Sequence, residues 1–366
     1  MKKERDSGME TLRLLAMALV ILVHAFSYGN FFTAASAVGG HVRASAVLVK
    51  LATRAAVDLF VLISGYFMIR APFELKKLYR RAGSIYLTIL FYSVVLTAVF
   101  LCLGRETLIY EGAQMAPGKA VLRALFPVSS QQWYFLTDYL LLCLLAPFAN
   151  LAVQKLTQKQ YAVLLAVLLW IFCGWMTLTR VEPFRGWFVL YGYDGLVSGK
   201  NVIWFLVLYL VGGYVSLFGK ERKRPNPAFL LLALAALLAN FYLYTRLPKS
   251  FGWRDTATKY TNVFVLLFAV AVLLFFKDLH FHCRPLNRCA SLTLGIYAIH
   301  EFCFVRHQIW SRLDFRAMDC TSILKNAGRL ALIVLGIMLV CGAAEFLRQE
   351  LFRLLAKGFK KIKKTE

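Results

Sequence analysis

Residues 9–26 read METLRLLAMALVILVHAF, an apolar run that is interrupted only by polar residues at its two ends, among them Arg13 and His24. A run of this length can cross a bilayer as a helix. The spacing of Arg13 and His24 is nearly three helical turns, so both side chains lie on one face, roughly 16 Å apart along the axis. Ionisable groups at membrane depth are costly and usually mark a substrate path or a proton relay. We therefore expect the first helix to carry part of a reactive site.

Similar apolar runs recur along the whole chain. Of its 366 residues 60% are hydrophobic, more than a soluble domain usually contains, so the surplus is expected to face lipid. We predict an all-α polytopic membrane protein, with residues 1–366 forming a single integral membrane domain around a helical core at 9–347. About ten transmembrane helices are expected, near 9–28, 48–69, 82–103, 133–153, 161–178, 201–219, 227–245, 260–276, 290–306 and 329–347.

The net charge of +24 is distributed as in a membrane protein. Basic residues are densest in alternate connections, such as 70–81 and 220–224, which predicts that both termini are cytoplasmic. Residues 348–366 are then a basic cytoplasmic tail against anionic lipid headgroups. This distribution argues for the lipid bilayer as a partner and against nucleic acid. The eight cysteines are scattered, and no group of His and Cys has the spacing of a standard metal site, so no metal is expected.

Asp58 is a candidate partner for His24. It lies twelve residues before Arg70, where the second helix is expected to end, and this places it close to the depth of His24. A His–Asp pair across adjacent helices orients the imidazole and raises its basicity, as a general base requires. The alternative is an inert buried ion pair or hydrogen bond that holds two helices together.

The second helix and the following basic turn supply candidates for binding an anionic donor. Ser64 and Gly65 allow a ligand to approach closely, although close helix packing explains them equally well. The run Lys76-Lys77-Leu78-Tyr79-Arg80-Arg81 suits a phosphate-bearing ligand, although basic residues are common in every inner loop. The candidate donor-binding residues are Arg13, Ser64, Gly65, Tyr66, Lys77, Arg80 and Arg81.

Five motifs together resemble the membrane-bound acyltransferase 3 family: Arg-x10-His at 13–24, DLFVLISGY at 58–66, K-x-x-R at 77–80, QWYFLTDYLLLCLLAP at 132–147 and LGIYAIH at 294–300. In this family the histidine matching His24 is the catalytic base, and the arginine matching Arg13 supports donor binding. Lys77 stands where the family more often has arginine.

The resemblance implies a membrane O-acyltransferase of the bacterial cytoplasmic membrane. Such an enzyme moves an acyl group, most often acetyl, from cytoplasmic acyl-CoA to a hydroxyl of an envelope or exported glycan or a lipid-linked sugar. Acetyl-CoA is then a co-substrate, and no permanently bound cofactor is implied. Direct attack on the thioester and an acyl intermediate on His24 both remain open.

Aromatic residues predict where a sugar acceptor binds. Six tryptophans (133, 175, 187, 204, 253 and 310) fall at or beyond the expected outer boundary, whereas an interfacial belt places Trp at both surfaces. We expect some of them to form a sugar-stacking platform, with Trp133, Tyr134 and Asp138 nearest the site. A one-sided belt is the alternative. Further candidates for lining the cavity are Glu10, Tyr297, His300 and Glu301, although His300 is also explained by a structural hydrogen bond.

Two other functions account for part of the pattern. A polysaccharide or lipid-sugar transporter or flippase explains Arg13, Asp58 and His300 as a substrate path, but it does not explain the Arg-x10-His match and the motifs that follow. A purely structural partner in a glycan-synthesis complex leaves the buried charges unexplained.

Overall fold

The computed structural model describes residues 6–184 and 198–362, with side chains up to residue 356. It is a bundle of helices, and a two-stranded antiparallel hairpin of β1 (Ile109–Tyr110) and β2 (Ala113–Gln114) is the sheet found in the described part. In chain order the α-helices are α1 (Ser7–Ser27), α2 (Phe31–Val38), α3 (Gly40–Thr53), α4 (Ala55–Met68), α5 (Leu75–Leu103), α6 (Pro117–Leu125), α7 (Tyr134–Val153), α8 (Gln158–Leu169), α9 (Met176–Leu178), α11 (Val202–Phe218), α12 (Ala228–Arg246), α13 (Trp253–Thr256), α14 (Val263–Phe276), α15 (Arg284–Ala290), α16 (Thr293–His300), α17 (Cys303–Arg312) and α18 (Ile323–Ile362).

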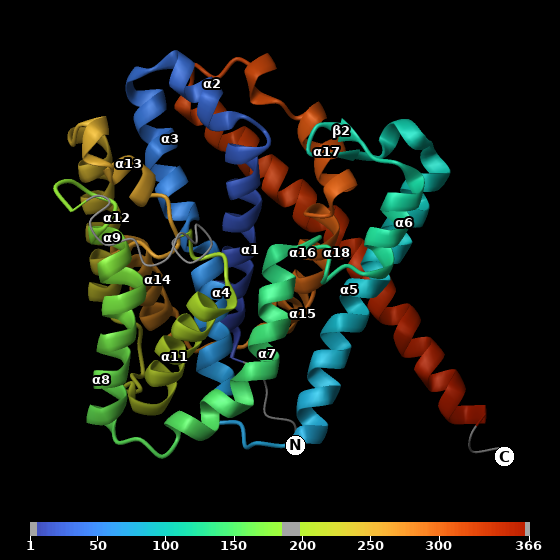
Figure 1. The fold of residues 1–366 in the computed structure, drawn as a ribbon, viewed down its shortest axis with the longest axis horizontal. Helices are drawn as coiled ribbons and strands as arrows, with labels where there is room; N and C mark the ends of the chain where they lie inside the picture. Colours follow the sequence, from blue (N-terminus) through green and yellow to red (C-terminus); the bar gives the residue numbers. More distant parts are fainter. Residues whose placement is uncertain (1–5, 185–197, 363–366) are drawn as a thin grey trace.

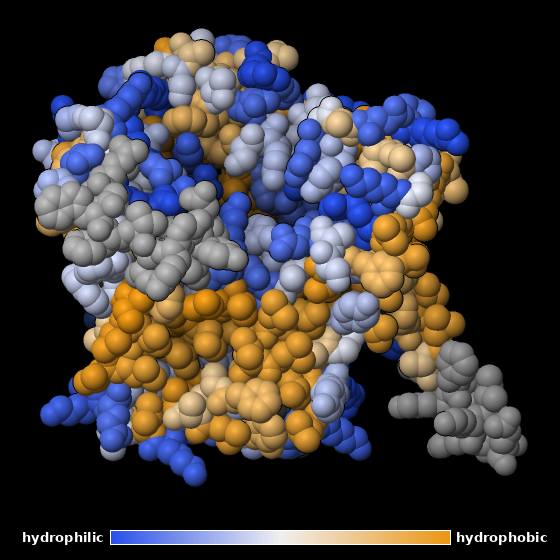
Figure 2. Space-filling view, in the orientation of Figure 1, coloured by the Kyte–Doolittle hydropathy of each residue, from blue (hydrophilic) through white to orange (hydrophobic). Residues whose placement is uncertain are grey.

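Helices α1 and α4 occupy the middle of the bundle (Figure 1). Helix α4 packs against α1, α11 and α14, and α1 also contacts α15, α16 and α18. The end of the bundle where α1 begins is called the N-terminal end here, and the opposite end, which carries α2 and the β-hairpin, is called the far end. In Figure 2 an apolar band lies next to the N-terminal end, and polar residues cover most of the far end.

Six helical segments of the described chain are long and apolar enough to cross a membrane, and α11 and α14 are shorter apolar helices. The polytopic helical class is therefore confirmed, whereas the expected number of ten spans and the cytoplasmic termini stay predictions. The six segments are Ser7–Ser27, Leu75–Leu103, Tyr134–Val153, Gln158–Leu178, Ala228–Arg246 and Ile323–Ala356.

The span expected at 161–178 is continuous, since a π-helical stretch, Trp170–Trp175, joins α8 to α9. Two other expected spans are divided between separate helices. The span expected at 48–69 is divided at Arg54 into α3 and α4. The span expected at 290–306 is divided into α16 and α17, with a break around Glu301 and Phe302. Polar side chains explain the second change, because a side chain that bonds to the backbone of its own turn competes with the regular helix. His300 does so through Nδ1, which lies 2.6 Å from the Ile296 carbonyl oxygen.

The start of α1 is anchored by polar contacts, which set the position of Arg13 one and a half turns later. Asp6 caps the helix by accepting a hydrogen bond from the Gly8 backbone N–H at 2.9 Å. Its carboxylate also lies 2.6 Å from Nδ1 of His280, and this hydrogen bond raises the pKa of His280. The Ser7 hydroxyl donates to Asn287 Oδ1 at 2.8 Å and so joins α1 to α15.

Two glycines bring α4 and α11 into backbone contact. A Cβ added at Gly65 would lie 2.0 Å from the Tyr209 carbonyl oxygen, and one added at Gly212 would lie 2.1 Å from the Leu62 carbonyl oxygen. Small residues at such crossings allow helices in a membrane to approach closely. Asn150 of α7 strengthens the same crossing, because it donates to the Met68 carbonyl oxygen at 2.9 Å and accepts from the Tyr209 hydroxyl at 2.7 Å.

Replacing Gly212 by Ala should lower the thermal unfolding midpoint of the purified protein by several degrees, because the new methyl group forces α4 and α11 apart at a cost of about 1–3 kcal/mol. Gly336→Ala in α18 is the matched control, since an added Cβ there meets nothing within 4 Å. Equal midpoints for the two variants would contradict the close crossing.

Candidate functional site

A cavity of about 680 Å³ opens among α1, α4, α5, α7 and α16 and is called the donor-side cavity. Its volume falls in the range of small-molecule sites. Four cationic side chains line it together with apolar and hydroxyl groups, so it suits an anionic ligand with an apolar part. The lining residues used below are Arg13, Phe60, Ser64, Phe67, Lys77, Arg80, Arg81, Phe135, Tyr139, Ser291, Thr293 and Tyr297.

Most of the predicted donor-binding residues meet in this cavity. Arg13, Ser64, Lys77, Arg80 and Arg81 all line it, although they come from three different helices. The Ser64 hydroxyl lies 3.2 Å from the Tyr139 hydroxyl, which the sequence analysis did not single out.

Three other candidates lie elsewhere. Gly65 faces α11 and serves helix packing, and the Tyr66 ring packs against Phe67, with ring centroids 5.3 Å apart. Glu10 is 3% exposed and forms an ion pair with Arg13, so it neutralises a cavity residue and does not line the cavity itself.

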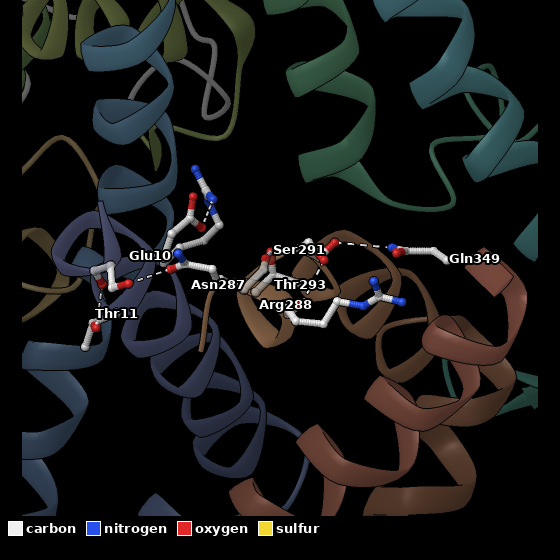
Figure 3. Close-up of polar contacts among 10 residues, drawn as sticks. Glu10, Thr11, Asn287, Arg288, Ser291, Thr293 and Gln349 are labelled. Atoms are coloured by element: carbon white, nitrogen blue, oxygen red, sulfur yellow. Dashed lines mark hydrogen bonds and ion pairs between the residues drawn. The ribbon is translucent and has the colours of Figure 1, made fainter. Parts of the chain in front are cut away.

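The short helix α15 and the turn after it contribute one wall of the donor-side cavity. Figure 3 shows polar contacts of this segment. The Ser291 hydroxyl donates to the Arg288 carbonyl oxygen at 2.7 Å, and the Thr293 hydroxyl donates to the Ala290 carbonyl oxygen at 3.0 Å. Gln349 of α18 donates to the Ser291 carbonyl oxygen at 3.4 Å. These bonds fix an irregular segment at the edge of the cavity.

A second, much smaller cavity of about 20 Å³ adjoins His24 and is called the histidine cavity. A cavity of that size holds roughly one water molecule. Its walls are made by α1, α4, α7, α16 and Tyr260, and the complete lining is Val20, Val23, His24, Ala56, Val57, Phe60, Tyr134, Phe135, Tyr260 and Tyr297. Phe60, Phe135 and Tyr297 line both cavities, so the two spaces meet at these three rings.

Glu301 is the carboxylate that faces His24. His24 Nδ1 lies 3.1 Å from Glu301 Oε2, which meets the distance of an ion pair but not the angles of a hydrogen bond. Catalytic hydrogen bonds are often poorly aligned before substrate binds. The other oxygen, Oε1, accepts from Arg306 Nη1 at 2.7 Å, and the Arg306 guanidinium lies 4.3 Å from the centre of the Tyr28 ring.

His300 lies directly beside His24, with the ring centroids 5.2 Å apart. Its Nδ1 donates to the Ile296 carbonyl oxygen at 2.6 Å, so in the neutral ring the free lone pair is on Nε2. That nitrogen is buried and has no hydrogen-bond partner in the described structure. His300 lines neither cavity, and neither does Glu301.

The expected pair of His24 and Asp58 is not formed. Within the described residues, Asp58 is fully buried and accepts one hydrogen bond, from the Trp204 indole at 3.4 Å, while its second oxygen is unpartnered. Matching the two residues by depth was insufficient, because depth along a helix does not determine the direction in which a side chain points. Glu301, which accepts a hydrogen bond from Arg306, is the carboxylate that lies beside His24 instead of Asp58.

The proposed sugar platform is not assembled as expected. Trp133 is 2% exposed and packs against Phe302, so it offers no face to a sugar. Tyr134 lines the histidine cavity, and its hydroxyl lies 3.4 Å from that of Tyr260. Asp138 is half-buried and lines none of the cavities described here. Trp187, another tryptophan of the expected platform, lies outside the described residues.

A third cavity, of about 410 Å³, opens at the far end and is called the far-end cavity. Polar and apolar groups both line it, and two of its residues reach toward His24: Arg306 binds Glu301, and the centroid of the Tyr28 ring lies 5.5 Å from that of the His24 ring. Arg306 is the last residue of the span expected at 290–306, and it is not among the site residues predicted from the sequence. The complete lining is Tyr28, Asn30, Ile109, Glu111, Gly112, Cys303, Arg306, His307, Trp310, Ser311, Asp314 and Arg316.

Comparison with known proteins identifies the family. The family model described as "Acyltransferase domain", that of the acyltransferase 3 family, matches residues 6–346, which is nearly the whole chain. The comparison with curated proteins finds no significant match, and neither does the comparison with solved structures. The match includes the helices that line all three cavities. The chain therefore belongs to the acyltransferase 3 family of membrane acyltransferases.

Proposed function

We propose that this acyltransferase transfers an acetyl group from cytoplasmic acetyl-CoA to a hydroxyl of an envelope or exported glycan or a lipid-linked sugar. The observation that carries the proposal is the meeting of a cation-lined cavity with the cavity of His24. The phosphates of coenzyme A suit Lys77, Arg80 and Arg81, since guanidinium groups bind phosphate through paired hydrogen bonds. We place the N-terminal end on the cytoplasmic side of a bacterial inner membrane, which follows from the positive-inside pattern.

In the proposed reaction His24 acts as a general base. Glu301 faces Nδ1, which favours the tautomer with a proton on Nδ1 and leaves Nε2 as the proton acceptor. The acceptor oxygen attacks the thioester carbonyl carbon and forms the C–O bond while its proton moves to Nε2. Collapse of the adduct breaks the C–S bond, and the coenzyme A thiolate takes the proton from His24. The products are the O-acetyl ester and free coenzyme A.

We infer that the acceptor enters from the far-end cavity. Arg306 lines that cavity and also binds Glu301, so an acceptor there is adjacent to the network that holds His24. This arrangement favours direct transfer, because donor and acceptor approach His24 from opposite ends and need no acyl carrier. A flippase or transporter remains the alternative, and it predicts movement of the sugar without formation of an ester.

The first test is acetyl transfer by the purified protein in nanodiscs, with labelled acetyl-CoA and an extract of cell-envelope glycans. We expect label in an alkali-labile ester for the wild type and a loss of about 10²–10⁴-fold for His24→Ala, because general-base catalysis contributes that much. His41→Ala, in α3 at the far end, is the matched control. Label transferred equally well by His24→Ala would remove His24 from the reaction, and no label from any variant would support transport.

The second test concerns Glu301. Glu301→Gln keeps the size of the side chain but removes the charge that faces Nδ1, so kcat should fall by roughly tenfold or more while KM for acetyl-CoA stays close to that of the wild type. A purely structural role predicts instead a lower unfolding midpoint with an unchanged kcat of the folded fraction. Asp58→Asn is the comparison, and we expect it to affect kcat less than Glu301→Gln does.

The third test concerns the donor. Arg81→Gln should raise KM for acetyl-CoA several-fold and leave KM for acetyl-pantetheine unchanged, because the shorter donor lacks the nucleotide phosphates that the guanidinium would bind. Arg222→Gln, an exposed residue whose guanidinium lies over Phe229, is the control for general charge loss. An equal rise for both donors would contradict phosphate binding at Arg81.

A further inference from the structure

Three aromatic rings stand where the donor-side cavity meets the histidine cavity. Phe60 comes from α4, Phe135 from α7 and Tyr297 from α16. The ring centroids of Phe60 and Phe135 are 5.9 Å apart, and those of Phe135 and Tyr297 are 5.2 Å apart. The three rings therefore form one contiguous cluster, which is called the aromatic barrier here.

The two cavities on either side of the aromatic barrier differ greatly in size. The donor-side cavity, at about 680 Å³, has space for an extended thioester arm, whereas the histidine cavity has only about 20 Å³. The remaining walls of the smaller cavity are Val20, Val23, Ala56, Val57 and two tyrosines, none of which has a long flexible side chain. A space for one water-sized group accepts a methyl group and excludes a longer chain.

Phe135 and Phe60 differ in their burial and in the number of other rings that pack against them. Phe135 also packs against Tyr139 and Phe205, with centroid distances of 5.9 and 5.5 Å, and is 7% exposed. Phe60 is only partly buried, and its ring contact within the described structure is the one with Phe135. Phe60 is therefore the member of the barrier that can be changed with the least effect on the surrounding core.

We propose that the aromatic barrier limits the acyl group to two or three carbons, by leaving behind it a space for little more than a methyl group. This inference rests on the proposed acyl transfer from coenzyme A. The sulfur and the pantetheine arm stay in the donor-side cavity, and the acyl tail passes the rings and occupies the histidine cavity. A longer tail does not fit into the space that the rings leave in that cavity, so its carbonyl carbon stops short of His24.

The test compares acyl-CoA donors of two, four and six carbons. For the wild type kcat/KM should fall steeply from acetyl to butyryl, because a closed pocket discriminates by roughly tenfold or more for each added methylene. In Phe60→Ala the kcat/KM for butyryl-CoA, divided by that for acetyl-CoA, should rise at least about tenfold. Phe67→Ala is the matched control, because Phe67 lines the donor-side cavity but not the histidine cavity. Its ratio of kcat/KM for butyryl-CoA to that for acetyl-CoA should equal the ratio of the wild type.

A binding measurement separates this inference from the proposed reaction. Each acyl-CoA should raise the unfolding midpoint of the protein that binds it, and in the wild type the rise should shrink from acetyl- to hexanoyl-CoA. In Phe60→Ala the rise in the unfolding midpoint should be the same for each acyl-CoA, even if no acceptor is present. Acetyl transfer with an unchanged chain-length ratio in Phe60→Ala would overturn the barrier and leave the reaction standing. Binding that depends on chain length, without transfer to any acceptor, would support the barrier and contradict the proposed reaction.

Phe60→Trp provides a second, opposite variant. A larger ring reduces the histidine cavity further while keeping an aromatic contact with Phe135, so transfer of acetyl should fall and transfer of butyryl should vanish. A Phe60→Trp protein that transfers butyryl as well as the wild type does would also overturn the proposal.

Discussion

The cost of burying ionisable groups constrains the whole molecule. A charged side chain in a low-dielectric interior is tolerated only where a partner of opposite charge or several hydrogen bonds compensate for lost hydration. Glu301 meets this requirement by accepting from Arg306 on one side and facing His24 on the other. Glu10 does the same for Arg13 at the N-terminal end. The two pairs mark the two ends of the path that the acyl group is proposed to follow.

The rest of the fold serves to hold these groups in place. The close crossing of α4 and α11 at Gly65 and Gly212 fixes α4, which contributes Phe60 and Ser64 to the donor-side cavity. The break between α16 and α17 places the buried Glu301 at a helix end, where it can face α1 across the bundle. Irregular backbone at such a depth is tolerated where it is buried in protein or lines a cavity.

Much of the fold was predictable from the sequence because apolar runs of membrane length have few other stable arrangements. Arg13, Lys77, Arg80 and Arg81 were expected near one another, and all four line one cavity. The helix boundary was predicted wrongly, because Lys77, Arg80 and Arg81, expected in a turn before residue 82, lie in the first turns of α5, which begins at Leu75. The partner of His24 was predicted wrongly because depth was known and azimuth was not: Asp58 points toward Trp204, and Glu301 reaches His24. Trp133 was misjudged for a related reason, since a boundary position does not show whether an indole faces outward or inward.

The aromatic barrier also bears on the transmembrane potential, which a leak through the protein would lower. The proposed reaction joins a cytoplasmic donor to an acceptor on the other side and so needs openings at both ends, whereas a continuous water-filled passage would dissipate the transmembrane potential. Within the described residues, the donor-side and far-end cavities are separated by three packed rings and by the network of His24, Glu301 and Arg306. The histidine cavity between them has space for a group about the size of a methyl. The same packing that selects the acyl group would thus keep the membrane sealed while the reaction proceeds.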